Sequence, residues 1–206
     1  MSTQPSLCEN LRRWLQLGSA TVMSALLLGC AQAEAPQVST ASAKLGEPQS
    51  LLIQGYNYTD DVIESFTVNG QGGGRLYLSD PTSGGGGSVC CVSYQPGTSL
   101  PIKLRVRWVG GYCIERVKSP YPYGKPYHDH RRHLWREAET QANDLSNGKP
   151  KALEVHVFAD GHVEAAITQG YSPPRLALPE NDKSERPGVT HNYLNCTNDQ
   201  LQQSGR

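Results

Sequence analysis

The sequence has no surplus of charge of either sign, because its 206 residues include 19 lysines and arginines against 19 aspartates and glutamates. Nucleic-acid-binding domains are typically more basic, so no nucleic acid is expected as a partner. No apolar run reaches the about 20 residues that a membrane-spanning helix needs. Six cysteines are too few for a disulfide-dense miniprotein. The 21 glycines, the 14 prolines and a mean hydropathy of -0.52 are typical of one loop-rich domain.

The first residues have the features of an export signal. Arg12 and Arg13 precede a short apolar stretch over residues 14–28. The last two residues of this stretch, with Gly29 and Cys30, form the sequence Leu-Leu-Gly-Cys. These last residues resemble the bacterial lipobox, in which the cysteine is acylated and becomes the first mature residue. We therefore expect residues 1–29 to be a lipoprotein signal peptide and Cys30 to carry the lipid. The alternative is an ordinary secretory signal with a chance cysteine.

A lipid on Cys30 would set the localisation of the chain. Several acyl chains on one residue hold a protein to a membrane without a transmembrane helix, so the membrane is an expected partner. Ala31, and not aspartate, follows the cysteine, and by resemblance to bacterial sorting rules this implies the outer membrane, with the chain facing the periplasm. Residues 30–50 contain Ala, Gln, Ser, Thr and Pro but no aromatic residue, which predicts a flexible tether.

From residue 51 the pattern changes to short β-rich runs between glycines and prolines. Basic residues alternate with the apolar residues Ile102, Leu104, Val106 and Trp108. This alternation predicts a strand with one buried and one solvent-exposed face, and it favours an antiparallel sheet. The expected strands cover residues 51–58, 63–68, 75–78, 89–94 and 102–109. We expect residues 51–178 to form the globular domain and residues 179–206 to be an irregular or disordered tail.

Two further elements complete the predicted fold. Asp160-Gly161 between the alternating runs 153–158 and 162–167 predicts a β-hairpin. Apolar residues at spacing four, Leu134, Ala138 and Ala142, predict one helix over residues 129–143. The expected fold class is α+β and β-rich, with one main helix against antiparallel sheet; a sandwich and a single curved sheet both remain open.

The motifs of common enzymes do not fit this chain. The glycine run over residues 69–75 lacks the following Lys-Ser or Lys-Thr and the helix of a phosphate loop, so loop geometry is its preferred interpretation. Ser88 follows a second run, residues 84–87, but Cys90 breaks the Gly-x-Ser-x-Gly pattern of a serine hydrolase. No Cys-x-x-Cys pair is present. We therefore expect no catalytic residue and no cofactor, and interpret the chain as non-enzymatic.

Four cysteines of the mature chain, apart from Cys30, are disulfide candidates: Cys90, Cys91, Cys113 and Cys196. In an oxidising compartment we expect one or two disulfides among them. Side chains of adjacent strand residues point to opposite faces, which favours different partners for Cys90 and Cys91. A bond from Cys196 back to this pair would close about 100 residues and stabilise the fold by up to about 4 to 5 kcal/mol. The connectivity stays open.

One cluster has metal-ligand character. On the predicted helix, His130, His133 and Glu137 would share a face. The neighbouring Arg131, Arg132 and Arg136 oppose a bound cation, so a solvated helix start is preferred and the metal site is the alternative.

Residues 119–127 form a proline-stiffened loop that contains Tyr121, Tyr123 and Tyr127. Tyrosine and arginine are common anchors of protein interfaces, and a stiff loop loses little entropy on binding. These tyrosines, with Arg75 in the first glycine-rich segment, are therefore candidates for binding a partner. Packing of the tyrosines against the domain is the alternative.

Four segments carry a resemblance to a known family: residues 55–59 (GYNYT), 66–74 (FTVNGQGGG), 84–91 (GGGGSVCC) and 158–164 (FADGHVE). Over residues 51–178 the chain resembles proteobacterial lipoproteins that carry a domain of unknown function. Members of that family are similar to immunity proteins of type VI secretion phospholipase effectors. The resemblance implies a non-enzymatic inhibitor that binds such a toxin in the periplasm; an envelope metal-binding or structural lipoprotein is the alternative.

Overall fold

The computed structural model describes residues 44–204 except residues 87, 181 and 183. The chain divides into two units, Met1–Ala41 and Ser42–Arg206, and the described residues belong to the second. The expected signal peptide, the lipidation residue Cys30 and most of the tether lie outside the described residues. Within the described part, no helix is long and apolar enough to cross a membrane.

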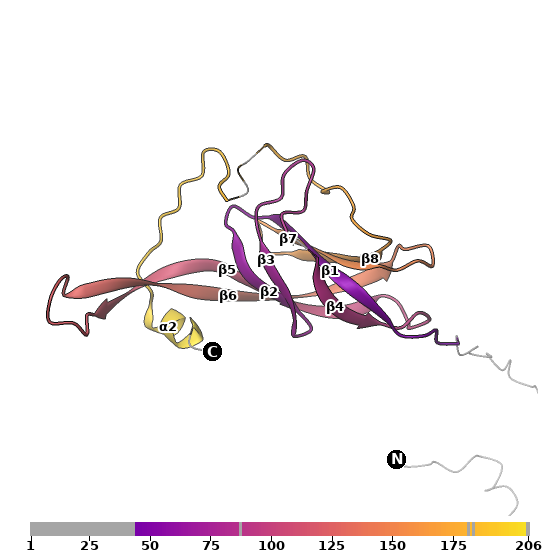
Figure 1. Cartoon of the computed structure of the whole chain (residues 1–206), viewed down its shortest axis with the longest axis horizontal. Helices are drawn as coiled ribbons and strands as arrows, with labels where there is room; N and C mark the ends of the chain where they lie inside the picture. Colours follow the sequence, from indigo (N-terminus) through magenta and orange to yellow (C-terminus); the bar gives the residue numbers. More distant parts are fainter. Residues whose placement is uncertain (1–43, 87, 181, 183, 205–206) are drawn as a thin grey trace, which may run out of the picture. The chain divides into compact units, whose positions relative to one another are not determined.

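Eight strands form one mixed sheet in the order β3-β2-β5-β6-β8-β7-β1-β4 (Figure 1). The elements are β1 (Gln49–Tyr58), β2 (Ile63–Val68), β3 (Gln71–Leu76), β4 (Val89–Tyr94), β5 (Ile102–Lys118), β6 (Tyr127–Asp144), β7 (Ala152–Phe158), β8 (Val163–Thr168) and the short helix α2 (Asn198–Ser204). Most neighbouring strands are antiparallel, but β1 pairs with β7 and β6 pairs with β8 in parallel.

The sheet curls so far that its two ends approach each other. Beyond the end of β3, the Tyr77 N–H donates to the Gly85 carbonyl, and Gly85 forms an isolated bridge with Tyr56 of β1. A Cβ built on Gly74 of β3 would lie 3.0 Å from Cγ2 of Val89 in β4. The result is a nearly closed, barrel-like sheet.

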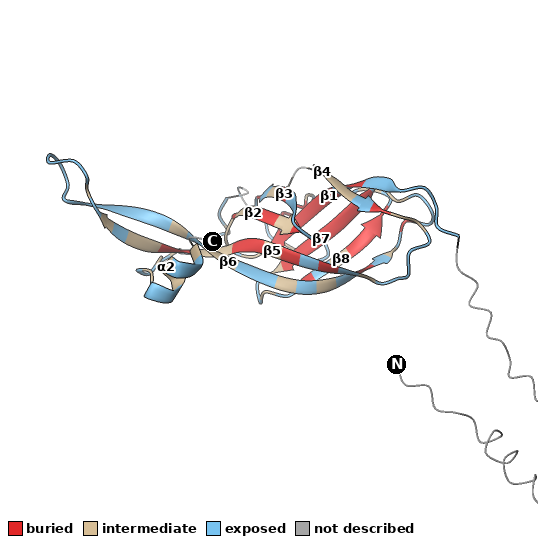
Figure 2. Ribbon diagram, turned by 90° about the horizontal axis from the view of Figure 1, so that it is seen from below, coloured by how far each residue is buried: buried red, intermediate tan, exposed pale blue. Residues whose placement is uncertain are grey.

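The hydrophobic core fills the concave side of this sheet, as the buried residues in Figure 2 show. Leu104, Val106 and Trp108 of β5 point into it while Lys103 and Arg105 are exposed, which confirms the predicted alternation. The same core contains apolar side chains from most other strands, including Ile53, Phe66, Leu76, Val155, Val157 and Ile167.

The predicted α+β fold class is wrong, because residues 129–143 lie in strand β6 and not in a helix. Leu134, Ala138 and Ala142 fit a strand as well as a helix, since a spacing of four is also a multiple of the strand period of two. What decides between the two is pairing: β6 lies antiparallel to β5 from Ala142 opposite Ile102 to Tyr127 opposite Lys118. The one described helix, α2, lies near the C-terminus instead.

The predicted hairpin is confirmed as β7 and β8. The Gly161 N–H donates to the Phe158 carbonyl at 3.0 Å, and Gly161 has φ of 89°, a conformation that favours glycine. The first glycine run, in contrast, is not only a loop, because Gly72–Gly74 lie within β3. A Cβ on Gly73 would overlap the ring of Phe66, so glycine lets β3 lie directly against a core aromatic.

Candidate partner-binding arm

The outer half of the β5–β6 ribbon forms an arm, residues 112–133. After a bulge at Gly110 and Gly111, the stretch from Tyr112 to Lys118 pairs with β6 alone, apart from one bridge between Ile114 and Asn195. Seven residues of strand span about 20 Å. Figures 1 and 2 show the arm extending away from the rest of the sheet, with mostly exposed residues.

The tip of the arm presents the three tyrosines that are predicted to bind a partner. Tyr121 is 72%, Tyr123 87% and Tyr127 52% exposed. The loop that carries them is closed by the Ser119 N–H, which donates to the Pro126 carbonyl at 2.9 Å. The alternative of packing against the domain does not fit Tyr121 and Tyr123 at these exposures.

Arg75, the fourth candidate for partner binding, lies apart from these tyrosines. It is on β3, where its guanidinium forms an ion pair with Glu64 at 2.9 Å and lies 5.0 Å from the ring centroid of Tyr77. No described contact joins Arg75 to the loop at the tip.

The arm is basic although the whole chain is neutral. Residues 112–133 include five lysines and arginines, three of the six histidines and only two acidic residues. Both acidic residues form cross-strand ion pairs: Asp129 with Arg116 at 3.0 Å, and Glu115 with Arg132. The hydrogen bond from Arg116 lowers the pKa of Asp129 below its ordinary value. The surplus of positive charge favours an acidic partner surface.

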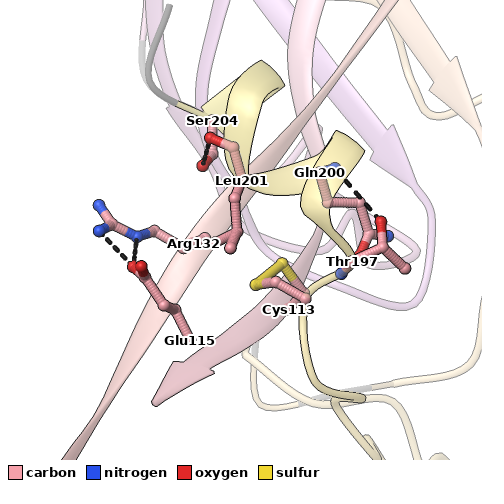
Figure 3. Close-up of a disulfide and its surroundings, with 8 residues drawn as sticks. Cys113, Glu115, Arg132, Thr197, Gln200, Leu201 and Ser204 are labelled. Atoms are coloured by element: carbon pink, nitrogen blue, oxygen red, sulfur yellow. Dashed lines mark hydrogen bonds and ion pairs between the residues drawn. A yellow bond between two sulfur atoms is a disulfide. The ribbon is translucent and has the colours of Figure 1, made fainter. Parts of the chain in front are cut away.

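The base of the arm is bound to the C-terminal segment. A disulfide joins Cys113 to Cys196, with the Cα atoms 4.9 Å apart (Figure 3). The Ile114 N–H donates to the Leu194 carbonyl at 2.9 Å, and the Cys196 N–H donates to the Ile114 carbonyl at 2.8 Å. Helix α2 follows directly and lies beside Arg132 and Glu115 (Figure 3). The arm is therefore braced at its base.

Aromatic stacking adds to this brace. The guanidinium of Arg131 lies 5.0 Å from the ring centroids of both Tyr112 and Tyr193, and these two rings meet edge to face at 5.6 Å. Such pairs stabilise beyond the area they bury.

The cysteines form two disulfides, as expected, but with a different connectivity from the one that strand geometry favoured. Cys90 is bonded to its neighbour Cys91 in β4, and Cys196 is bonded to Cys113. The long loop from Cys196 back to the adjacent pair is therefore not formed; the bond to Cys113 has a sequence separation of 83 instead.

The alternative metal ligands do not come together. Residues an odd number apart on a strand point to opposite faces, so His130 faces away from His133 and Glu137. His133 and Glu137 share a face but lie about 13 Å apart along an extended strand. Among the residues that the structure describes, no group of three or more His, Cys, Asp or Glu side chains could hold a metal ion.

A second polar cluster, which no sequence motif predicts, lies under the segment that follows β8. Tyr56 and Tyr58 of β1 and Glu154 and His156 of β7 are buried side by side. The rings of Tyr56 and His156 stack with centroids 4.2 Å apart. The Ser172 N–H donates to Glu154 Oε1 at 2.8 Å, so this segment covers the cluster.

The hydrogen bonds fix the state of His156. The Tyr58 hydroxyl accepts the Arg175 N–H at 2.8 Å and lies 3.0 Å from His156 Nδ1, the nearby acceptor to which we assign the proton of this hydroxyl. Nε2 then carries the proton and faces Glu154 Oε2 at 3.7 Å, too far for a hydrogen bond. Burial lowers the pKa of His156, which keeps the ring neutral.

Glu154 stays ionised beside this neutral ring. Burial alone would raise the pKa of Glu154, but the interactions with His156 and Ser172 outweigh it and hold the pKa below its ordinary value. Burial, together with the charge of Glu154, raises the pKa of Tyr56 to about 12. Alternation along β7 puts His156 on the face opposite Val155 and Val157; only the covering segment buries it there, and the sequence has no local signal for that contact.

Comparison with known proteins identifies one family. The family described as "Protein of unknown function (DUF3304)" matches residues 56–165, which span β1 to β8 and include the whole arm. No curated protein and no solved structure matches the chain.

Proposed function

The chain belongs to the DUF3304 family of proteins of unknown function, and from this premise we propose that it is a non-enzymatic immunity protein that binds a type VI secretion phospholipase effector. The observation that carries the proposal is the arm tip, where Tyr121 and Tyr123 are exposed on a ribbon that extends from the sheet. An outer-membrane lipoprotein that faces the periplasm would meet such a toxin where it attacks the envelope.

The construction of the arm suits inhibition by insertion. A two-stranded ribbon is narrow enough to enter a concave site, and ligand and substrate sites are typically concave. Tyrosines supply large contact areas with few rotatable bonds, so little side-chain entropy is lost on binding. The prolines of the tip and the brace at Cys113 hold the arm in one conformation before the partner arrives, which further reduces the entropy lost on binding.

The two disulfides support the proposed localisation. Disulfides form and persist in oxidising compartments, including the bacterial periplasm, and are rare in the cytosol. Their presence at Cys90–Cys91 and Cys113–Cys196 agrees with export through the lipobox that ends at Cys30.

The test is survival of bacteria under attack. A strain that lacks the gene is exposed to attackers that deliver the phospholipase effector, and we expect it to be killed unless the wild-type gene is restored. Complementation with Cys30→Ser separates the effect of membrane localisation from the effect of binding, because this variant keeps the arm but loses the acylated thiol. Equal survival with and without the gene, for every lipase effector delivered, would overturn the proposal.

A further inference from the structure

The long strand β6 has one side without a partner over most of its length. On one side it pairs with β5 from Tyr127 to Ala142. On the other side it pairs with β8 only at Ala142–Asp144. In the part of the chain that the structure describes, no other strand pairs with residues 127–141 on this side, which we call the open edge. Figure 1 shows β6 running well past β8 toward the arm.

The backbone of β6 is oriented to accept a strand there. The Leu145 N–H donates to the Ile167 carbonyl at 2.8 Å, so the odd-numbered residues of β6 direct their backbone groups to this side. On the arm and at its base, the residues with backbone N–H and C=O groups at the open edge are Tyr127, Asp129, Arg131, His133 and Trp135. Such a row is a template for pairing with another chain.

Within the described part of the chain, a segment pairs with the opposite edge of the arm and none pairs with this one, although helix α2 also lies against β6 beside Arg132. The edge of β5 receives Leu194 and Cys196, which exchange backbone hydrogen bonds with Ile114. The disulfide from Cys113 to Cys196 holds that cover in place. Only one edge of this ribbon is paired in the part of the chain that the structure describes, which leaves the backbone groups of the other edge available to a partner strand.

The charge along the open edge indicates what that partner is. Over the outer part of this edge, residues 127–136, three arginines and three histidines accompany one acidic residue, Asp129; Glu137 and Glu139 follow only at the inner end. A second copy of this chain would bring like charges together, which is unfavourable. A strand with acidic side chains would instead be complementary.

We propose that an extended acidic segment of the partner protein adds to the sheet as a strand along the open edge of β6, opposite residues 127–135. This mode of recognition gives affinity through backbone hydrogen bonds and selectivity through side-chain charge. This inference rests on the proposed function in one respect, because it assumes that the acidic segment belongs to the toxin.

The test uses the purified full-length protein and a fluorescent ten-residue peptide of alternating glutamate and valine. We expect it to bind at least about tenfold more tightly than a Lys-Val peptide, which carries the opposite charge, or a Glu-Pro peptide, in which proline removes every second backbone donor. On binding, backbone amides of odd-numbered residues between 129 and 135 should become protected from hydrogen exchange.

Substitution at His133 separates backbone pairing from side-chain contact. His133→Pro removes an N–H at the open edge while leaving the pairing with β5, and proline is tolerated at such edges; His133→Ala keeps that N–H. We expect His133→Pro to weaken the Glu-Val peptide about tenfold relative to His133→Ala, at equal thermal stability. The inference would be overturned if His133→Pro and His133→Ala bound the Glu-Val peptide equally well, or if the wild-type protein bound the Lys-Val peptide as tightly as the Glu-Val peptide. Sedimentation showing that a second copy of the chain occupies the edge would overturn it as well.

The two proposals fail separately. Should the peptide not bind while the wild-type gene still protects bacteria from the effector, strand addition is excluded and the immunity function stands. Should the peptide bind while the gene protects against no effector, the open edge serves a different partner.

Discussion

Cys113 at the base of the arm is bonded to Cys196, 83 residues later in the sequence, so the element proposed to bind and the C-terminal segment form one unit. The segment between them crosses the buried cluster at Ser172 and reaches the end of β1 through Arg186. The arm is therefore braced by residues outside its own ribbon, and loss of any of these contacts should loosen it.

Removal of this disulfide should reduce stability more than removal of the other. In the double variant Cys113→Ala/Cys196→Ala we expect the free energy of unfolding in urea to fall by about 2 to 4 kcal/mol, because the bond closes a long loop. The matched control is Cys90→Ala/Cys91→Ala, whose bond joins adjacent residues and closes no loop. Equal losses in the two double variants would show that the bond to Cys196 does not act as a long-range brace.

Arg186 should hold the C-terminal segment in place. Its largely buried guanidinium donates to the carbonyls of Thr59 at 2.9 Å and Asn57 at 3.2 Å. Arg186→Ala leaves these carbonyls without the donor and should lower the free energy of unfolding by about 1 to 3 kcal/mol. Limited proteolysis should cut within residues 176–195 sooner, and the exposed Arg105→Ala serves as the control. An unchanged cleavage rate would contradict this role.

Acidification below about pH 6.5 should destabilise the fold through His156. Because burial lowers the pKa of His156 from its ordinary value of 6.5, the unfolded chain binds a proton that the folded chain does not. Stability then falls as the pH decreases, by at most about 1.4 kcal/mol per pH unit from this group. Between pH 6.5 and 5, where carboxylates contribute little, His156→Gln should reduce the change in the free energy of unfolding with pH. The control His130→Gln, on the exposed arm, should leave that change as it is in the wild-type protein. A slope that is the same in His156→Gln and in the wild-type protein would rule out His156 as its source.

Two parts of the sheet follow from local pattern alone. Alternation in β5 and the Asp160-Gly161 turn are local signals, and both are confirmed. In β6 the local signal was ambiguous, since Leu134 and Ala138 fit either period, and only pairing with β5 resolves it. Long-range pairing is a property of the folded chain and leaves no trace within a short window of sequence.

The candidate site was predictable in composition but not in geometry. The proline and tyrosine content of residues 119–127 indicated a stiff binding loop, yet its place at the tip of an arm depends on the length of β5 and β6. The burial of Glu154 and His156 depends on a covering segment about 20 residues later, whose contacts no periodicity encodes. Residue type alone indicates Arg75 as a binding residue, but the fold places it on β3, apart from the tip of the arm.

The most direct test of the account is the affinity of the purified full-length protein for the phospholipase effector that it neutralises in the survival assay. Isothermal titration would compare the wild-type protein with Tyr121→Ala/Tyr123→Ala and with Tyr171→Ala, a control tyrosine outside the arm that is 71% exposed. Exposed anchors that become buried in an interface typically contribute about 2 kcal/mol or more each, so the arm variant should bind at least about 100-fold more weakly at unchanged thermal stability. The control should bind like the wild type. Undiminished binding by the arm variant would contradict the claim that the tip of the arm recognises the toxin.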